Sequence, residues 1–529
     1  MNFQLKTRMV TGFIAIIMTF YGVAYADGAT EKEVKSVPNI ATDSTQKQLV
    51  NEVKKSGKYG YLDQTGAFVI PAEFNELTLF REQGLILAKQ KGKYGVFDQT
   101  GKSVLPVIFD VANIQEDNTI LVKQKNKWGI YDSQGNMILP VAFDELTAFS
   151  SGLAAAKKDK IWRYYDKTGK VAFEAGFDGA NRFSEGLAVV MHDNKYGYID
   201  VQGKAITPYQ YRYAVDFSEG LAAVRTKDNW GFIDKTGKIV IEEKFRSYES
   251  GFKEGLAIVN QKSKHDYIDV HGNIVFSAPY DYVFPFENGL AEVRVEKSSF
   301  SWGGLISSAL SMQFGGCTDP ANNNLVAYNL KRGFIDKTGN LIITTKYDLV
   351  CVFQDGLAKV VDHGKYGFVN RKGEFVIPAE YQGISDFEDG LAVYKKDGKW
   401  GYIDKTSKPL TAFKFDEAKA FSCDLGAVKI GEKWGFIDRT GTVVIKGKFD
   451  DVKPFVDSIA AVKYNGAWGV VDVSGKYVIP AKSAYEEMSV LNHDFIGIKI
   501  NDKWGILNKD GRIIVEPQYD TIWPISFLK

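Results

Sequence analysis

The sequence is poor in cysteine and histidine, the residues from which cross-links and metal centres are most often built. Its 529 residues include three cysteines, and an odd number allows at most one intrachain disulfide in an oxidising compartment. Cys317, Cys351 and Cys423 provide no disulfide framework, and we interpret Cys351 and Cys423 as small buried hydrophobic residues. His265 and His271 are separated by five residues and the other three histidines lie far apart, so the sequence predicts no metal site and no cofactor.

An excess of charge of one sign is also missing. With 66 basic and 65 acidic residues the formal net charge is +1, and the two signs are mixed along the chain. Because a nucleic-acid-binding surface needs a basic stripe that neutralises phosphates, we expect no nucleic acid partner. Proline is scarce, with 14 residues against 51 glycines, which indicates frequent turns rather than a proline-rich disordered region.

An apolar segment opens the sequence. Lys6 and Arg8 precede the apolar stretch Met9–Val23, and Ala24-Tyr25-Ala26 offers the small residues that signal peptidase requires. This pattern predicts a signal peptide over 1–26; an uncleaved anchor is the alternative, although the stretch is shorter than the roughly 20 residues of a bilayer span. Loss of the two basic residues leaves a net charge of −1, and no cysteine follows the cleavage site, which argues against a lipid anchor. We expect a periplasmic or secreted protein without a membrane span.

What the sequence has in abundance is one short pattern, an aromatic residue and a glycine followed by two apolar residues and aspartate. Clear copies are Lys58-Tyr59-Gly60-Tyr61-Leu62-Asp63 and Lys433-Trp434-Gly435-Phe436-Ile437-Asp438. With this glycine as an anchor, successive copies are 34 to 36 residues apart, except for one interval of 67 before Gly333. Arg163 and Asp266 occupy the anchor in two degenerate copies. The intact anchors are Gly60, Gly95, Gly129, Gly197, Gly231, Gly333, Gly367, Gly401, Gly435, Gly469 and Gly505.

Each copy continues with the features of a short antiparallel meander. A second glycine follows the anchor by six residues in twelve of thirteen copies, Ser407 being the exception, and its positive φ would let the flanking strands form a hairpin. The aspartate before this turn is expected to accept local backbone hydrogen bonds. A proline that follows in six copies is expected to end the strand ladder, and a segment such as Phe387-Glu388-Asp389-Gly390-Leu391-Ala392 begins a further strand. Each repeat is thus predicted to contain about three strands.

The pattern resembles the WG-repeat family, also called KWG repeats, over nearly all of residues 50–529. The resemblance is specific because the aromatic-glycine pair, the aspartate, the turn glycine and the Gly-Leu-Ala segment recur in register many times. It implies a bacterial repeat protein from a family that largely lacks assigned biochemistry.

A single repeat is too small to bury a core of its own, so it must pack on its neighbours. We expect an all-β fold of tandem β-meander repeats, stacked as an open, curved β-solenoid, because Val50–Lys55 already gives the first repeat its leading strand. The alternative is two β-propeller-like units of seven and six repeats. The predicted organisation is a polar leader at 27–48, repeats 1–7 at 49–296, a Ser/Gly/Asn-rich insertion at 297–331 and repeats 8–13 at 332–529.

The aromatic residue before the anchor occupies one structural position in eleven of the thirteen repeats. We interpret this aromatic stripe as a stacked ladder in the core; an exposed ladder that binds glycans or peptides is the alternative. The repeated aspartates are interpreted as turn residues, since calcium sites need denser acidic loops. The stripe comprises Tyr59, Tyr94, Trp128, Trp162, Tyr196, Trp230, Tyr366, Trp400, Trp434, Trp468 and Trp504.

Nothing in these patterns singles out catalytic residues, and we expect no enzyme activity. The first hypothesis is an exported, non-catalytic protein that binds a protein or peptide, or acts as a scaffold, in the cell envelope. The second hypothesis is a carbohydrate or cell-wall binder that stacks sugars on exposed tryptophan and tyrosine. The third is an envelope enzyme with a polar cleft near the 297–331 insertion.

Overall fold

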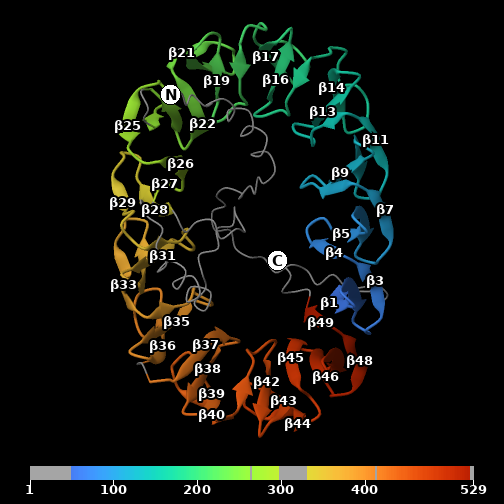
Figure 1. Ribbon diagram of the computed structural model, residues 1–529, viewed down its shortest axis with the longest axis vertical. Helices are drawn as coiled ribbons and strands as arrows, with labels where there is room; N and C mark the ends of the chain where they lie inside the picture. The colour runs from blue at the N-terminus through green and yellow to red at the C-terminus, as the bar shows by residue number, and fades with distance from the viewer. Residues whose placement is uncertain (1–48, 262–264, 297–329, 412–413, 525–529) are drawn as a thin grey trace, which may run out of the picture.

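The computed structural model describes residues 49–261, 265–296, 330–411 and 414–524, and every regular element in them is a β-strand. The strands form thirteen antiparallel sheets of three or four strands each. Figure 1 shows these sheets as successive blades around one elongated ring. The predicted signal peptide, the predicted leader and residues 297–329 of the predicted insertion lie outside the described residues.

The blades are numbered 1 to 13 along the chain, and their strands are ordered from the inside of the ring to its rim (Figure 1). The innermost strands are β49 (Thr521–Pro524) of blade 1, then β4 (Glu76–Phe80), β8 (Val111–Ile114), β12 (Glu145–Leu146), β15 (Gly179–Ala180), β18 (Tyr213–Ala214), β22 (Ser247–Lys253), β26 (Tyr282–Glu287), β30 (Leu349–Val350), β34 (Gly383–Ile384), β37 (Glu417–Ser422), β41 (Asp451–Val452) and β45 (Glu487–Asn492). The second strands are β1 (Leu49–Lys55), β5 (Leu85–Gln90), β9 (Thr119–Gln124), β13 (Leu153–Lys158), β16 (Leu187–His192), β19 (Leu221–Arg225), β23 (Leu256–Asn260), β27 (Leu290–Glu296), β31 (Leu357–Asp362), β35 (Leu391–Lys396), β38 (Leu425–Ile430), β42 (Ile459–Tyr464) and β46 (Phe495–Ile500).

The remaining strands complete the blades towards the rim. The third strands are β2 (Lys58–Asp63), β6 (Lys93–Asp98), β10 (Lys127–Asp132), β14 (Ile161–Asp166), β17 (Lys195–Asp200), β20 (Trp230–Asp234), β24 (His265–Ile268), β28 (Leu330–Ile335), β32 (Lys365–Asn370), β36 (Lys399–Asp404), β39 (Lys433–Ile437), β43 (Ala467–Asp472) and β47 (Lys503–Asn508). The outer strands are β3 (Phe68–Phe74), β7 (Ser103–Phe109), β11 (Met137–Phe143), β21 (Ile239–Phe245), β25 (Ile274–Ala278), β29 (Leu341–Ile343), β33 (Phe375–Tyr381), β40 (Val443–Phe449), β44 (Tyr477–Lys482) and β48 (Ile513–Tyr519). Blades 4, 5 and 10 have isolated β-bridges in place of a continuous outer strand.

The boundaries of the sequence repeat and of the structural blade are offset by one strand. The residues that follow an outer strand cross over to the next blade, as β41 does when it pairs with β42. The three-stranded meander predicted for each repeat therefore receives a fourth, innermost strand from the repeat before it.

The two ends of the described chain meet in blade 1. β49 pairs antiparallel with β1, with Thr521 opposite Lys54 and Ile522 opposite Val53. The backbone nitrogen of Asp520 donates to the carbonyl oxygen of Lys54 at 2.7 Å. One buried cluster joins the two ends and contains Val53, Leu62, Leu491, Ile506, Val515, Tyr519 and Ile522. The last repeat thus closes the ring with a strand.

The open solenoid predicted from the sequence is not confirmed, because this pairing closes the array. The alternative is supported in part: the blades are propeller-like, but they form one ring of thirteen instead of two units of seven and six. Val50–Lys55, the basis for predicting an open array, lies in the second strand of blade 1. The innermost strand of this blade is provided by Thr521–Pro524, at the other end of the chain.

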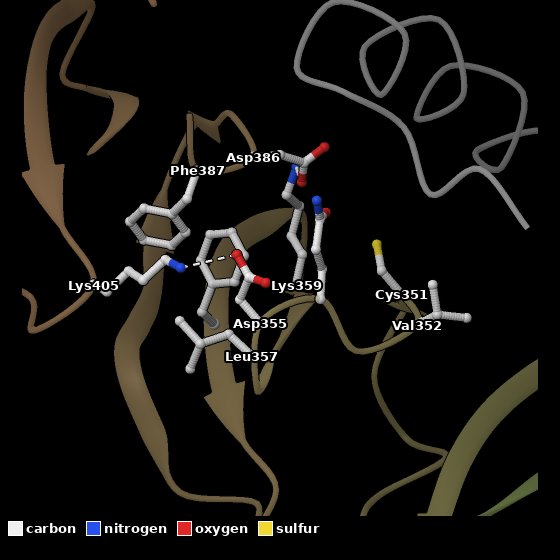
Figure 2. A pocket seen from close by; sticks show the side chains of 10 residues that line it. Cys351, Val352, Asp355, Leu357, Lys359, Asp386, Phe387 and Lys405 are labelled. Atoms are coloured by element: carbon white, nitrogen blue, oxygen red, sulfur yellow. Dashed lines mark hydrogen bonds and ion pairs between the residues drawn. The ribbon is translucent and has the colours of Figure 1, made fainter. Parts of the chain in front are cut away.

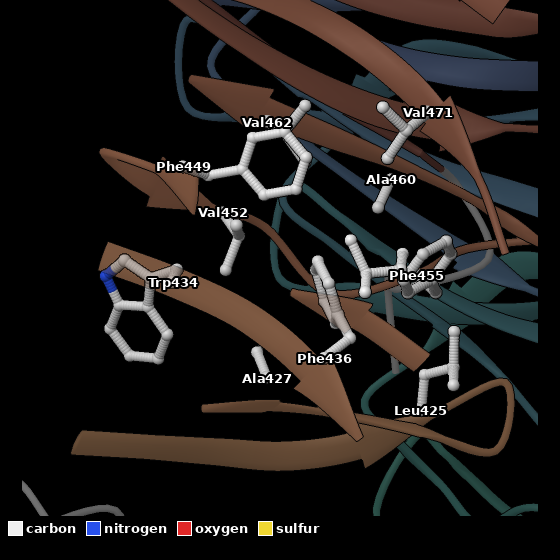
Figure 3. Close-up of a cluster of buried hydrophobic side chains, with 11 residues drawn as sticks. Leu425, Ala427, Trp434, Phe436, Phe449, Val452, Phe455, Ala460, Val462 and Val471 are labelled. Carbon is white, nitrogen blue, oxygen red and sulfur yellow. The ribbon is translucent and has the colours of Figure 1, made fainter. Parts of the chain in front are cut away.

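The hydrophobic core is divided among the interfaces between neighbouring blades. Figure 3 shows the interface of blades 11 and 12, where Trp434 and Phe436 of β39 share a cluster with Val452 and Phe455. The rings of Phe436 and Phe455 meet edge to face, with centroids 4.8 Å apart. The described residues form thirteen such clusters, one for each pair of neighbouring blades. Each blade therefore depends on both of its neighbours for burial.

The turn between the third and outer strands is built as predicted. In blade 11, Oδ1 of Asp438 accepts hydrogen bonds from the backbone nitrogens of Thr440 at 2.8 Å and Thr442 at 3.0 Å, and from the Thr440 hydroxyl at 2.6 Å. These hydrogen bonds, that of the Thr440 hydroxyl above all, lower the pKa of Asp438 because they stabilise its carboxylate. Gly441 completes the turn with a φ of 80°.

The anchor glycine faces a bulge in the outer strand. In blade 11, Trp434 pairs with Phe449 and Phe436 pairs with Ile445, so Gly435 alone lies opposite three residues of β40. A Cβ at Gly435 would lie 2.5 Å from the carbonyl oxygen of Ile445. Glycine is required here because the backbone of the bulge approaches closely, and not because of its φ.

Blade 7 lacks both the glycine and the bulge at this point. Asp266 pairs with Ser277 and Tyr267 pairs with Phe276, so the ladder is regular where other blades are bulged. The Ser277 hydroxyl donates to the carboxylate of Asp266. The degenerate anchor at position 266 is therefore matched by a change in its partner strand.

Five of the six prolines lie inside outer strands, and Pro208 lies in blade 5, which has no continuous outer strand. β3 contains Pro71, and pairing resumes at Phe74, which faces Tyr59. The prediction that proline ends the ladder is therefore wrong. Proline occupies the bulge of the outermost strand, where no neighbouring strand of the blade needs its missing N–H group.

Candidate functional site

The aromatic stripe lies near the start of the third strands, and none of its rings is exposed. Trp162, Tyr366, Trp434 and Trp468 are buried, and the other seven residues of the stripe are partly buried. In eight blades a cation of the second strand lies 5.0 to 5.8 Å from the ring centroid, which adds a cation–π contact to burial. The pairs are Lys54–Tyr59, Lys89–Tyr94, Lys123–Trp128, Lys157–Trp162, Arg225–Trp230, Lys395–Trp400, Lys429–Trp434 and Lys463–Trp468. Little ring surface is left for a sugar to stack on.

Blades 7 and 8 carry polar side chains at the stripe position. In blade 8, Nε of Arg332 donates to Oε1 of Glu292 at 2.9 Å, and Arg294 donates to the same oxygen. Glu292 lies on β27 at a position that is apolar in most other blades. In blade 7, Nδ1 of His265 lies 2.7 Å from Oε2 of Glu249. These polar residues in a mostly apolar or aromatic register are visible in the sequence, but the common aromatic stripe does not include them.

Blade 9 buries a lysine. Lys359 lies on β31 at the position that Glu292 occupies in blade 8, and 3% of its surface is exposed. Its Nζ lies 2.7 Å from Oδ1 of Asp386, which precedes β35 in blade 10. Burial lowers the pKa of Lys359, and the nearby Asp386 carboxylate opposes this shift.

Lys359 and Asp386 line a small hollow between blades 9 and 10 (Figure 2). Lys405 and Asp355 form a second ion pair at its wall, with 3.0 Å between Nζ and Oδ2. The hollow has a volume of about 60 Å³, whereas one water molecule occupies roughly 30 Å³ of the liquid. It offers a cation and a carboxylate to a small polar group, but it does not enclose a molecule of substrate size.

Replacing the buried lysine is expected to show how much its buried charge destabilises the fold. In Lys359→Met the thermal unfolding temperature should stay the same or rise, because Asp386 keeps access to water while a desolvated ammonium is removed. Asp386→Asn should instead destabilise the fold by roughly 3 kcal/mol, since the buried ammonium loses its carboxylate. Because the folded-state pKa of Lys359 lies below 10.5, the destabilisation caused by its buried charge shrinks as the pH rises towards that value. Melting curves at neutral and alkaline pH test this. The difference in melting temperature between Lys359→Met and the wild type should become smaller at alkaline pH, and a larger difference there would contradict a buried charged lysine.

A second, wider depression lies over blades 10 to 12. It has a volume of about 410 Å³ and is open to solvent. Glu388 and Asp389 provide carboxylates at its edge, and Pro454 provides exposed apolar surface. This combination suits a basic or apolar side chain of a peptide better than a reacting small molecule.

The loops of the ring fall on two opposite faces. Because neighbouring strands are antiparallel, successive loops of a blade alternate between these two faces. One face, named here the turn face, carries the loops between innermost and second strands and the turns between third and outer strands. The hairpins between second and third strands share the other, the hairpin face, with the connections between blades. On the turn face, Lys235 of blade 6 lies 2.9 Å from Glu185 of blade 5. On the hairpin face, Asp450 pairs with Lys433 of blade 11 and accepts the N–H of Gly466 of blade 12 at 2.8 Å.

Three possible metal ligands gather on the hairpin face of blade 5. Donor atoms of Asp178, His192 and Asp193 lie within 4.8 Å of one another, and all three residues are exposed. Asp178 already accepts the N–H of Asp193 at 2.8 Å, as Asp450 does for the hairpin of blade 12. The group therefore follows the ordinary hairpin geometry, and nothing further marks it as a metal site.

The regular features on this ring have a counterpart among known proteins. The sequence profile described as "WG containing repeat" matches thirteen consecutive segments, which run from residue 59 to residue 526 and cover most of the chain. The chain belongs to the WG containing repeat family. The matched segments are 59–94, 94–128, 128–160, 162–196, 196–230, 230–264, 267–297, 333–366, 366–400, 400–434, 434–466, 468–504 and 504–526. No curated protein matches this WG-repeat sequence.

Solved structures resemble the WG-repeat ring only distantly. A eukaryotic initiation factor is 10% identical, with a TM-score of 0.29, over 76% of this chain and 96% of that one. The extracellular domain of the putative one component system BT4673 from B. thetaiotaomicron is 11% identical, with a TM-score of 0.22, over 88% and 75% of the two chains. PorZ, a surface component of the type-IX secretion system of Porphyromonas gingivalis, is 9% identical, with a TM-score of 0.22, over 88% and 80%. These likenesses are too weak to support a function for the WG-repeat protein.

The cysteines of the WG-repeat protein differ from the sequence interpretation. Cys351 is buried as expected, but it is disulfide-bonded. Cys423 is a free, exposed cysteine in the loop between β37 and β38, so its interpretation as a buried hydrophobic residue is wrong. Cys317 lies outside the described residues. Within the described parts of the chain, no helix is long and apolar enough to cross a membrane.

Proposed function

We propose that this WG-repeat protein is exported and acts as a non-catalytic binding or scaffolding protein of the cell envelope, with a protein or peptide as its partner. The signal-peptide pattern at 1–26 supports export. A scaffolding role fits an architecture in which the repeated residues are used for turns, blade contacts and closure. The loops, which differ between blades, then provide the specific contacts.

The observation that carries the proposal is the shape of the described surface. The hollow at Lys359 has a volume of about 60 Å³, whereas the depression between Glu388 and Pro454 has a volume of about 410 Å³ and is open to solvent. An open depression with carboxylates and exposed apolar atoms is suited to side chains presented by a partner, because these need not be enclosed. Catalysis would instead require a site that excludes water around the reacting atoms.

Affinity capture with chemical cross-linking tests this proposal. The mature chain, residues 27–529, is used as bait in an envelope extract, beside a variant that lacks 297–329 and a variant with Glu388→Lys and Asp389→Lys. We expect one recurrent protein partner, cross-linked to the loops of blades 10 to 12, that the charge-reversed variant fails to retain. Partners that depend on 297–329 alone would move the function to the insertion and contradict a role for the depression.

Binding of sugars by the aromatic stripe is the alternative that the geometry disfavours. Since every stripe ring is at least partly buried and most are covered by a cation, soluble glycans should leave the tryptophan fluorescence unchanged. Titration with cell-wall glycans at millimolar concentration measures this. Two tryptophans lie outside the stripe: Trp523, which is exposed, and Trp302, which is outside the described residues. Both should be replaced by Phe in a parallel sample so that their signal is not mistaken for that of the stripe. Saturable quenching that persists in this double variant would refute the prediction.

A further inference from the structure

The hairpins of blades 1 to 4 form a basic region on the hairpin face. Within 54–58, 89–93, 123–127 and 157–160 there are twelve lysines and a single acidic residue, Asp159. Four of the later hairpins carry an acidic residue at the tip and fewer lysines, namely those with Asp193, Asp228, Glu432 and Asp502. The hairpin of blade 10 matches that of blade 4, with three lysines around Asp397. Blades 1 to 4 are therefore distinguished by four adjacent basic hairpins, whereas the basic hairpin of blade 10 stands alone.

Half of these lysines form an ion pair or cover a ring of the aromatic stripe. Four form ion pairs with acidic residues at the connections between blades: Lys89 with Glu76, Lys93 with Asp110, Lys127 with Asp144, and Lys157 with Glu145. Two more, Lys54 and Lys123, cover the stripe rings of Tyr59 and Trp128.

The other six lysines form no ion pair within the described residues, and we name them the lysine arc. Five are exposed and one, Lys58, is partly exposed. Lys55 donates to the neutral side chain of Gln518 at 2.7 Å, which leaves its charge uncompensated. The lysine arc comprises Lys55, Lys58, Lys91, Lys125, Lys158 and Lys160.

The same four blades have the opposite charge on their turn face. Their loops and turns there carry seven acidic residues and four basic ones, a net charge of −3. The acidic residues are Asp63, Glu82, Asp98, Glu116, Asp117, Asp132 and Asp166, and the basic ones are Arg81, Lys102, Lys167 and Lys170. This part of the ring, four of its thirteen blades, is therefore polarised across the shortest dimension of the molecule, the direction of view in Figure 1. The near-neutral net charge of the whole chain conceals this separation.

We propose that the lysine arc docks the ring on a membrane surface that contains anionic phospholipids, with the hairpin face towards the headgroups. Stacked sheets lie about 10 Å apart, so the four hairpins present their charges over roughly 30 Å. All six cations are lysines on protruding hairpins, and a compact ammonium on a flexible stem suits mobile phosphate headgroups, whereas arginine would suit fixed bidentate contacts. The flat face of a ring favours a planar partner over a protein pocket.

Vesicle sedimentation with the full mature chain tests this proposal. Vesicles of phosphatidylcholine alone are compared with vesicles that also contain phosphatidylglycerol, at low and at high salt. Each lysine that reaches an anionic surface strengthens binding roughly five-fold. Replacing the six residues of the lysine arc with glutamine should therefore weaken binding to the phosphatidylglycerol vesicles by at least about 100-fold, and high salt should release the wild type because it screens exposed charges.

A matched variant separates location from net charge. It replaces six exposed lysines on the turn face, five of which follow a turn glycine and one of which follows Ser407. It should bind these vesicles as the wild type does. The substitutions are K102Q, K170Q, K204Q, K238Q, K408Q and K476Q. Equal weakening by both variants, wild-type binding by the variant of the lysine arc, or binding to soluble polyphosphate without binding to the vesicles would each overturn the proposal. Melting temperatures within a few degrees of the wild type show that both variants fold.

Discussion

Ending the chain at Asp520, before β49, is expected to open the ring and to destabilise the fold by several kcal/mol. The truncation removes four paired residues from the edge of β1 and exposes the backbone groups that they satisfy. It also removes Ile522, which is 6% exposed and packs in the cluster that holds both ends of the ring. Burying an isoleucine side chain contributes roughly 1.5–3 kcal/mol, and the cavity left beside Val53 and Tyr519 adds to the loss.

Two point variants on the same strand distinguish the effect of losing ring closure from a general effect of changing the C-terminus. Ile522→Ala should cost about 2–4 kcal/mol, since its side chain is buried. Trp523→Ala should cost less than about 0.5 kcal/mol, since 55% of its surface is exposed. Thermal unfolding measures both, and small-angle scattering should show a larger maximum dimension for the truncated chain. A truncated chain that keeps the melting temperature and dimensions of the wild type would show that β49 does not hold the ring closed.

Closure could not be predicted from the sequence because the pairing of β1 with β49 joins segments at opposite ends of the chain. The local pattern predicts strands, turns and their order, and it placed the turn glycine and the aspartate of residues 434–441 correctly. Whether thirteen units return to their starting point depends on the small rotation between successive blades, which accumulates around the ring. No residue within a single repeat reveals the size of that rotation.

The candidate sites were predictable to different degrees. Glu292, Arg332 and Lys359 stand out in the sequence as charged residues at positions that are apolar or aromatic in most other blades. Their partners do not stand out: Asp386 lies in a loop of the next blade, where acidic residues are common, and only the packing of blades 9 and 10 brings it to Lys359. The uneven distribution of lysine among the hairpins was likewise visible, but its meaning required the knowledge that these hairpins share one face.

Gly435→Ala is expected to have the largest effect of any single-methyl addition in blade 11. The added Cβ would lie 2.5 Å from the carbonyl oxygen of Ile445 and 2.7 Å from the backbone nitrogen of Gly447. Both contacts are with backbone, which cannot rotate away as a side chain can, so the bulge of β40 must shift. Overpacking of this kind costs roughly 1–3 kcal/mol, and the lost pairing between β39 and β40 adds to it.

Two control variants distinguish this steric requirement from the general preference for glycine in turns. Gly466→Ala adds the same methyl at a hairpin glycine with φ of 79° and nothing within 4 Å, so it should cost only the strain of a left-handed alanine, about 1 kcal/mol. Asp266→Ala changes the same position of the repeat in blade 7, where no bulge faces it, and should cost about 1 kcal/mol for the hydrogen bond to Ser277. Hydrogen exchange of the amides in β39 and β40 should report faster opening in Gly435→Ala alone. Equal protection in Gly435→Ala and Gly466→Ala would mean that the bulge moves freely, and the recurrence of the anchor glycine would then need another cause.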